Sequence, residues 1–141
     1  MALLDRFRPR PVTAFAVLTL VIWTTRIPLA WTNDEDTVAE KLVWSTPITL
    51  FVVASAALLV LQARGEGVGP KSSRLTRVFA AATIVYWTIR IAMIVGGDWS
   101  VGFKVVHAVL AVLSSGAAAL AWRSVGGTDR SQDRTPAPVV A

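Results

Sequence analysis

The sequence predicts an all-α membrane protein in which four transmembrane helices form two duplicated helical hairpins packed as a four-helix bundle. Three observations lead to this prediction. Hydrophobic residues make up 54% of the 141-residue chain and charged residues only 16%, which is too apolar for an ordinary water-soluble domain or enzyme. Four apolar runs are long enough to cross a bilayer. Part of the first run also recurs in the third.

The four apolar runs are Val12 to Trp31, Leu42 to Ala63, Val78 to Val95 and Val101 to Trp122. A bilayer core of about 30 Å needs about 20 helical residues, and helices satisfy their backbone amides within one segment, as lipid requires. The alternating polar residues of a closed barrel are absent. The first run is too long for the apolar part of a secretory signal, so we expect it to be retained as a span.

Polar segments divide the chain between these runs. We expect a basic cytoplasmic N-terminus at 1–11, a first hairpin at 12–63, a cytoplasmic linker at 64–77, a second hairpin at 78–122 and a disordered cytoplasmic tail at 123–141.

Local signals predict the helix ends. Thr37-Val38-Ala39-Glu40 is a capping box for the second helix. Gly96-Gly97 ends the third helix, and Ser100 can cap the fourth. Within the fourth helix, the spacing Ala111-x3-Ser115-x3-Ala119 predicts a face for close helix contact.

The positive charges predict the orientation. Of the 14 Lys and Arg residues, three precede the first span, four lie in the 64–77 linker and three follow the fourth span. By the positive-inside rule these segments are cytoplasmic, which makes the chain a multi-pass plasma-membrane protein with both termini inside. Attraction to anionic lipid explains the net charge of +5, so we expect no nucleic-acid partner.

An internal duplication is indicated at an offset of 64 residues. It is carried by eight identities: Phe15, Ala16, Thr19, Val21, Trp23, Thr24, Arg26 and Ile27 match Phe79, Ala80, Thr83, Val85, Trp87, Thr88, Arg90 and Ile91. With a one-residue gap, Trp44 then stands where the second copy has His107. Both copies start inside, so we expect a pseudo-two-fold axis along the membrane normal.

The polar residues inside the spans are the candidate binding site. Arg26 and Arg90 lie about 8 Å from the outer ends of their helices, and an indole three residues earlier can stack on each guanidinium. Tyr86 shares a helical stripe with Arg90, and His107 enters the fourth span at a similar depth. The predicted polar layer near the outer surface comprises Arg26, Arg90, His107, Tyr86, Trp23, Trp87, Asp34 and Asp98.

Three interpretations of this layer stay open. First, each arginine pairs with a loop carboxylate and with carbonyls freed near Pro28 or Gly96, or anchors to lipid phosphate. Second, the two arginines bind an anion or the acidic residue of a partner protein. Third, the layer is catalytic, which is the least favoured because His107 lacks a paired carboxylate. We therefore expect no catalytic residue.

Metals and cofactors are not expected either. The chain has no cysteine, which excludes iron-sulfur clusters and thiol chemistry, and a zinc site lacks ligands. Haem would require Met93 as the partner of His107. The absence of a carboxylate within the spans also argues against a small proton-coupled multidrug exporter.

The segment Asp98 to Ser114, which contains Gly-Phe-Lys-Val-Val-His at 102–107, and the preceding Trp87-Thr88-Ile89-Arg90 resemble small four-span integral membrane proteins of actinobacteria. The resemblance covers about the last two spans. It implies a bacterial plasma-membrane protein, and it implies neither a substrate nor a catalytic residue.

Together these observations favour a non-enzymatic accessory or scaffolding subunit, with the arginine layer as an external docking or lipid-contact site. Its partners would be the lipid bilayer and either another membrane protein or further copies of itself. The alternative is a small anion or small-molecule transporter or channel that works as a homo-oligomer and uses Arg26 and Arg90.

Overall fold

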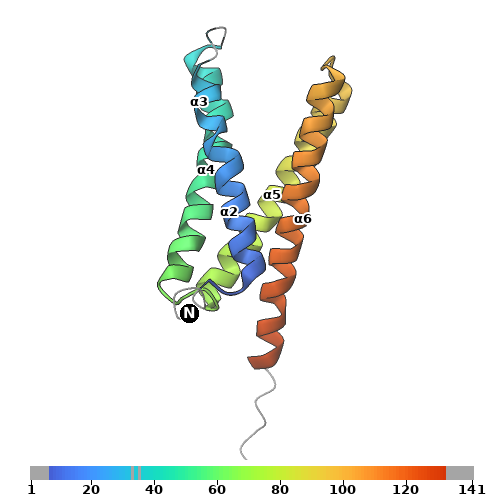
Figure 1. Cartoon of the computed structure of the whole chain (residues 1–141). Coiled ribbons are helices and arrows are strands. Elements are labelled where there is room, and N and C mark those ends of the chain that lie inside the picture. Colours follow the sequence, from blue (N-terminus) through green and yellow to red (C-terminus); the bar gives the residue numbers. More distant parts are fainter. Residues whose placement is uncertain (1–6, 33, 35, 133–141) are drawn as a thin grey trace, which may run out of the picture.

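The computed structural model describes residues 7–32, 34 and 36–132, and this part of the chain contains helices and no strands. The helices are α2 (Arg10–Thr24), α3 (Arg26–Trp31), α4 (Val38–Ala63), α5 (Pro70–Gly96) and α6 (Val101–Gln132) (Figure 1). Four stretches are long and apolar enough to cross a membrane, the first formed by α2 with most of α3. The predicted all-helical, four-span fold is confirmed.

The first span is interrupted at Thr25, between α2 and α3. Pro28 explains the position of this break, because its ring lacks an N–H and clashes with the carbonyl four residues earlier, that of Thr24. At the break itself, the Thr25 hydroxyl donates to the Ile22 carbonyl at 2.8 Å. Arg26 therefore begins a new short helix.

The predicted helix ends are confirmed at three places. Thr37 N donates to the Glu40 carboxylate at 2.8 Å and Glu40 N donates to the Thr37 hydroxyl at 3.3 Å, which completes the capping box of α4. The Ser100 hydroxyl accepts from Phe103 N at 3.3 Å at the start of α6, and α5 ends at Gly96.

Two predicted boundaries were wrong. The linker predicted at 64–77 is shorter, because α5 already begins at Pro70, where a proline in the first turn costs no hydrogen bond. The tail predicted to be disordered from 123 is helical as far as Gln132, since no proline interrupts the chain there to end the helix. Positions 133–141 of that prediction lie outside the described residues.

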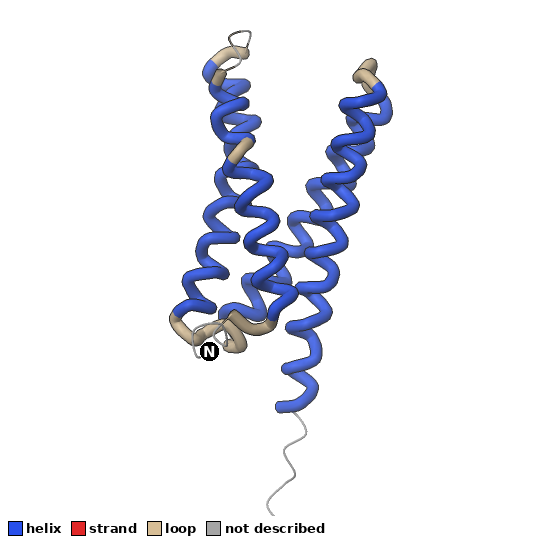
Figure 2. The backbone as a smooth tube through the Cα atoms, viewed as in Figure 1, coloured by secondary structure: helices blue, strands red, loops and turns tan. Residues whose placement is uncertain are grey.

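The two hairpins form a V (Figures 1 and 2). The segment α2–α3 packs along α4, and α5 packs along α6. The hairpins approach each other near the start of α2 and diverge toward the loops at 32–37 and 97–100. We call these the terminal end and the loop end. Of the two seams between the hairpins, α2–α6 is the more extensive and α4–α5 the sparser.

Six aromatic side chains fill the centre between the hairpins. This aromatic block consists of Phe15, Trp23, Phe51, Phe79, Tyr86 and Trp87. The Phe15 and Phe79 rings lie 4.7 Å apart between centroids, and Phe51 lies 5.7 Å from Phe79. Such distances are typical of favourable aromatic pairs. The block holds the hairpins together at the level where they begin to diverge.

The α6 helix supplies small side chains to this packing. Its buried face is Ala111, Ser114, Ala118 and Ala121, which follow one another at helical spacings of three and four. The face predicted from Ala111, Ser115 and Ala119 was therefore wrong in register, because Ala119 is exposed. A run of consecutive small residues does not by itself determine the rotation of a helix.

We expect Phe79→Ala to lower the free energy of unfolding by about 3 kcal/mol, because it opens a cavity in the aromatic block. Val85→Ala, on the exposed side of the same helix, is the matched control and should change it by less than about 1 kcal/mol. Unfolding in mixed micelles followed by circular dichroism measures both. Equal losses would show that the block does not hold the hairpins together.

Candidate functional site: a cavity between the hairpins

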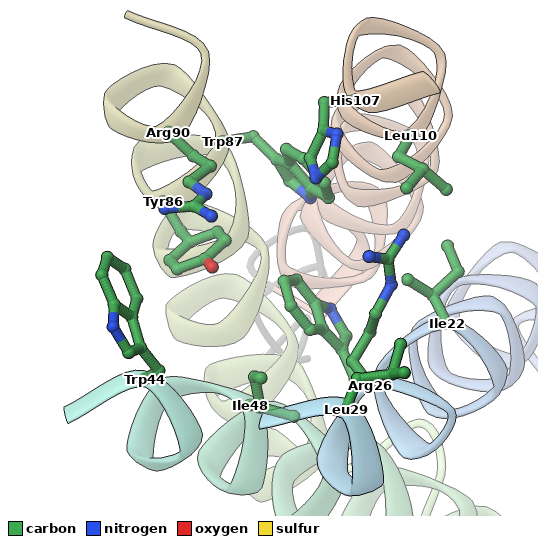
Figure 3. Close-up of a pocket in the computed structure, with 11 residues that line it drawn as sticks. Ile22, Arg26, Leu29, Trp44, Ile48, Tyr86, Trp87, Arg90, His107 and Leu110 are labelled. Carbon is green, nitrogen blue, oxygen red and sulfur yellow. The ribbon is translucent and has the colours of Figure 1, made fainter. Parts of the chain in front are cut away.

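A cavity of about 210 Å³ lies where the hairpins diverge, on the loop-end side of the Phe15–Phe79 pair (Figure 3). All four spans contribute to it. Its lining residues are Ile22, Trp23, Arg26, Leu29, Trp44, Ile48, Tyr86, Trp87, Arg90, His107 and Leu110. Six of the predicted site residues are thus brought together: Arg26, Arg90, His107, Tyr86, Trp23 and Trp87.

The two arginines reach this cavity from different hairpins. Arg26 begins α3 directly after the break at Thr25, and Arg90 lies near the end of α5. Both are half-buried. Neither forms a hydrogen bond or ion pair with any residue in the described ranges. The cavity is therefore positively charged, with two guanidinium groups whose donors are uncommitted.

One of the open interpretations, in which these arginines pair with the loop aspartates, is wrong. Asp34 and Asp98 are exposed and do not line the cavity. Both lie in loops beyond the helix ends, whereas the arginine side chains turn inward between the hairpins (Figure 3). Each aspartate follows its arginine by eight residues in the sequence. This shared spacing does not bring either aspartate to its arginine.

The predicted stacking of each arginine on the tryptophan three residues earlier is also wrong. The guanidinium of Arg90 lies instead over Trp44 of α4, with its central carbon 5.0 Å from the ring centroid. Trp23 and Trp87 belong to the aromatic block and face each other at 5.8 Å between centroids. Packing at the centre of the bundle thus takes the two indoles away from the arginines.

Trp23 and Trp87, which both line the cavity, have buried indole nitrogens without a hydrogen-bond acceptor among the described residues. Both side chains are buried, and neither Nε1 has a hydrogen-bond partner within the part of the chain that the structure describes. An indole N–H is a donor only, and burying it without an acceptor costs about 1–3 kcal/mol. An acceptor that reached either nitrogen would remove this cost.

His107 is held in place by its own helix. It is buried, and its Nδ1 lies 2.9 Å from the Phe103 carbonyl. Because a carbonyl only accepts, Nδ1 carries a proton and Nε2 is the second ring position available to a ligand. The ring points into the cavity (Figure 3). Met93, considered above as its partner for haem, lines a different groove.

The lining suits an anion that also carries an apolar part. Guanidinium groups donate hydrogen bonds, and none of the described residues that line the cavity is a carboxylate that could neutralise the arginines. Carboxylate and phosphate are the groups that guanidinium recognises best. Ile22, Ile48 and Leu110 add apolar wall.

Residues that match at the 64-residue offset occupy corresponding places around this cavity. Phe15 faces Phe79, and Trp23 faces Trp87. Thr19 and Thr83 each donate to the carbonyl four residues earlier, at 2.8 and 2.9 Å. These contacts are the ones expected if the two hairpins pack around a pseudo-two-fold axis.

Trp44 is a site residue that was not predicted from the sequence. It contacts Arg90 and lines the cavity. A signal was present, because the 64-residue offset with its one-residue gap aligns Trp44 with His107, and both residues line the cavity. The apolar lining residues Ile22, Leu29, Ile48 and Leu110 carry no comparable signal in the sequence.

Comparison of the chain with protein-family models, with curated proteins and with solved structures finds no match.

A cysteine at position 110 should react with a small anionic thiol reagent, because the Leu110 side chain lines the positively charged cavity. In the purified protein we expect Leu110→Cys to react at least ~10-fold faster with a sulfonate-bearing methanethiosulfonate than Ala118→Cys, since residue 118 is fully buried on the same helix. The natural chain has no cysteine to interfere. Similar rates at the two positions would contradict an accessible cavity.

Proposed function

We propose that this multi-pass membrane protein is an anion-binding protein, in which Arg26 and Arg90 hold a carboxylate or phosphate group between the two hairpins. The observation that carries this proposal is the lining of the cavity: two unpaired guanidinium groups meet there, and none of the described residues that line it is a carboxylate. Bidentate guanidinium contacts suit an oxyanion of this kind.

The shape of the site favours binding over conduction. The aromatic block closes the cavity toward the terminal end, with Phe15 and Phe79 in contact at 4.7 Å and Phe51 beside them. A channel would need this block to open. We therefore place the protein as a non-enzymatic binding or accessory subunit, and a small transporter is the alternative.

In the same proposal the loop end faces the outside of a bacterial plasma membrane. The basic segments at the terminal end support this orientation through the positive-inside rule. The cavity then lies in the outer half of the bilayer. Asp98→Cys should react with an impermeant maleimide added to intact cells, whereas Arg123→Cys should react only after lysis. The reverse pattern would overturn the orientation.

The two hairpins are further proposed to be copies of one duplicated unit. The facing pairs Phe15–Phe79 and Trp23–Trp87 support this origin, because residues on a two-fold axis meet their own equivalents. A duplication would explain why the site has two arginines and two indoles rather than one of each.

We expect the double variant Arg26→Gln/Arg90→Gln to bind inorganic phosphate and acetate at least ~30-fold more weakly than the natural chain, since each lost charge-assisted bond is worth about 1.5–3 kcal/mol. Tryptophan fluorescence is a direct readout, because Trp23 and Trp87 line the cavity. Choline serves as the cationic probe and should not bind.

Arg123→Gln is the matched control, because Arg123 is an exposed arginine on the terminal-end half of α6. It should leave both affinities unchanged. Unchanged phosphate and acetate binding in the double variant would contradict the proposed site. Phosphate flux into liposomes that depends on Arg26 and Arg90 would instead assign the site to transport.

A further inference from the structure

A second groove opens beside the cavity, at the sparser α4–α5 seam. Its volume is about 190 Å³, and it is lined by Val43, Trp44, Pro47, Tyr86, Ile89, Arg90 and Met93. Trp44, Tyr86 and Arg90 line both spaces. The groove and the cavity are therefore separated only by shared side chains.

The groove is apolar and faces the bilayer. Val43, Ile89 and Met93 are exposed side chains in the middle or outer parts of two candidate spans. In a membrane such positions contact lipid chains. Arg90 is the only charged residue in the lining. An acyl chain lying in this groove would bring its headgroup to Arg90.

The wall between the two spaces is the contact between Arg90 and Trp44. The guanidinium carbon lies 5.0 Å from the Trp44 ring centroid, and Trp44 is 44% exposed. At the corresponding position of the other hairpin, His107 is 8% exposed and fixed to the Phe103 carbonyl. The seam between α2 and α6, the helix that carries His107, is also the more extensive one. Trp44 can therefore move aside more readily than His107.

We propose that the ligand is a lipid with a phosphate monoester headgroup, and that it enters sideways from the bilayer through the α4–α5 seam. The headgroup reaches Arg26 and Arg90 in the cavity, while the chain stays in the groove beside Val43 and Met93. This inference rests on the anion site proposed above. The membrane concentrates such a lipid next to the seam, so a short displacement of Trp44 admits the headgroup without taking the chain out of lipid.

The test compares dodecyl phosphate with inorganic phosphate, using tryptophan fluorescence of the full chain in phosphatidylcholine nanodiscs. The key variant is Val43→Trp, which fills the groove from an exposed position. Its matched control is Val106→Trp, the equivalent exposed position on α6, which does not line the groove. Dodecanol and dodecyltrimethylammonium test the need for the negative charge.

We expect the natural chain to bind dodecyl phosphate at a total concentration at least ~10-fold below that needed for inorganic phosphate, and not to bind dodecanol or the cationic amphiphile. Val43→Trp should lose at least ~10-fold in affinity for dodecyl phosphate while keeping its affinity for inorganic phosphate, which also shows that it folds. Val106→Trp should match the natural chain.

Two results would overturn lipid entry through the α4–α5 seam. One is unchanged binding of dodecyl phosphate by Val43→Trp; the other is a loss confined to Val106→Trp, which would place entry at the opposite seam. In either case, inorganic phosphate binding that still depends on Arg26 and Arg90 would leave the anion site intact. If the double arginine variant retains binding of both probes, the anion site itself fails.

Discussion

The aromatic block between the hairpins is the contact on which the rest of this structure depends. In lipid, helices gain no hydrophobic free energy by associating, so close packing of side chains must hold them together. Here ring contacts such as Phe15–Phe79 and Phe51–Tyr86 join the hairpins across the centre. Below the block the hairpins are close together. Above it the described residues form no further ring–ring contact between the hairpins, and the cavity occupies the resulting angle.

The same packing determines the chemistry of the cavity. Trp23 and Trp87 turn toward each other to complete the block, and both residues also line the cavity. Arg26 and Arg90 stand above them without a carboxylate. Charged side chains in a membrane normally pair with one another or with carbonyls. The absence of such a partner among the described residues is the strongest reason to assign this site to a ligand rather than to the stability of the fold.

Much of this site could be predicted from the sequence, because helical periodicity and the 64-residue offset are both visible there. Together they predict that Arg26, Arg90, Trp23, Trp87 and Tyr86 share one level, and length predicts the spans. The errors arose where periodicity gives no information. Asp34 and Asp98 lie in loops, whose direction the helical repeat does not define. The contact between Arg90 and Trp44 depends on how two helices are rotated against each other, and a single sequence does not contain that rotation.

The difference between Trp44 and His107 has a consequence for how a ligand is seated. A pocket with exact two-fold symmetry presents the same surroundings to a ligand and to its image rotated by half a turn, so both poses would be equally populated. In this protein a flat indole covers one side and a fixed imidazole the other. One difference of this kind is enough to make the two poses unequal, so a site with two similarly placed arginines would still hold its ligand in one orientation.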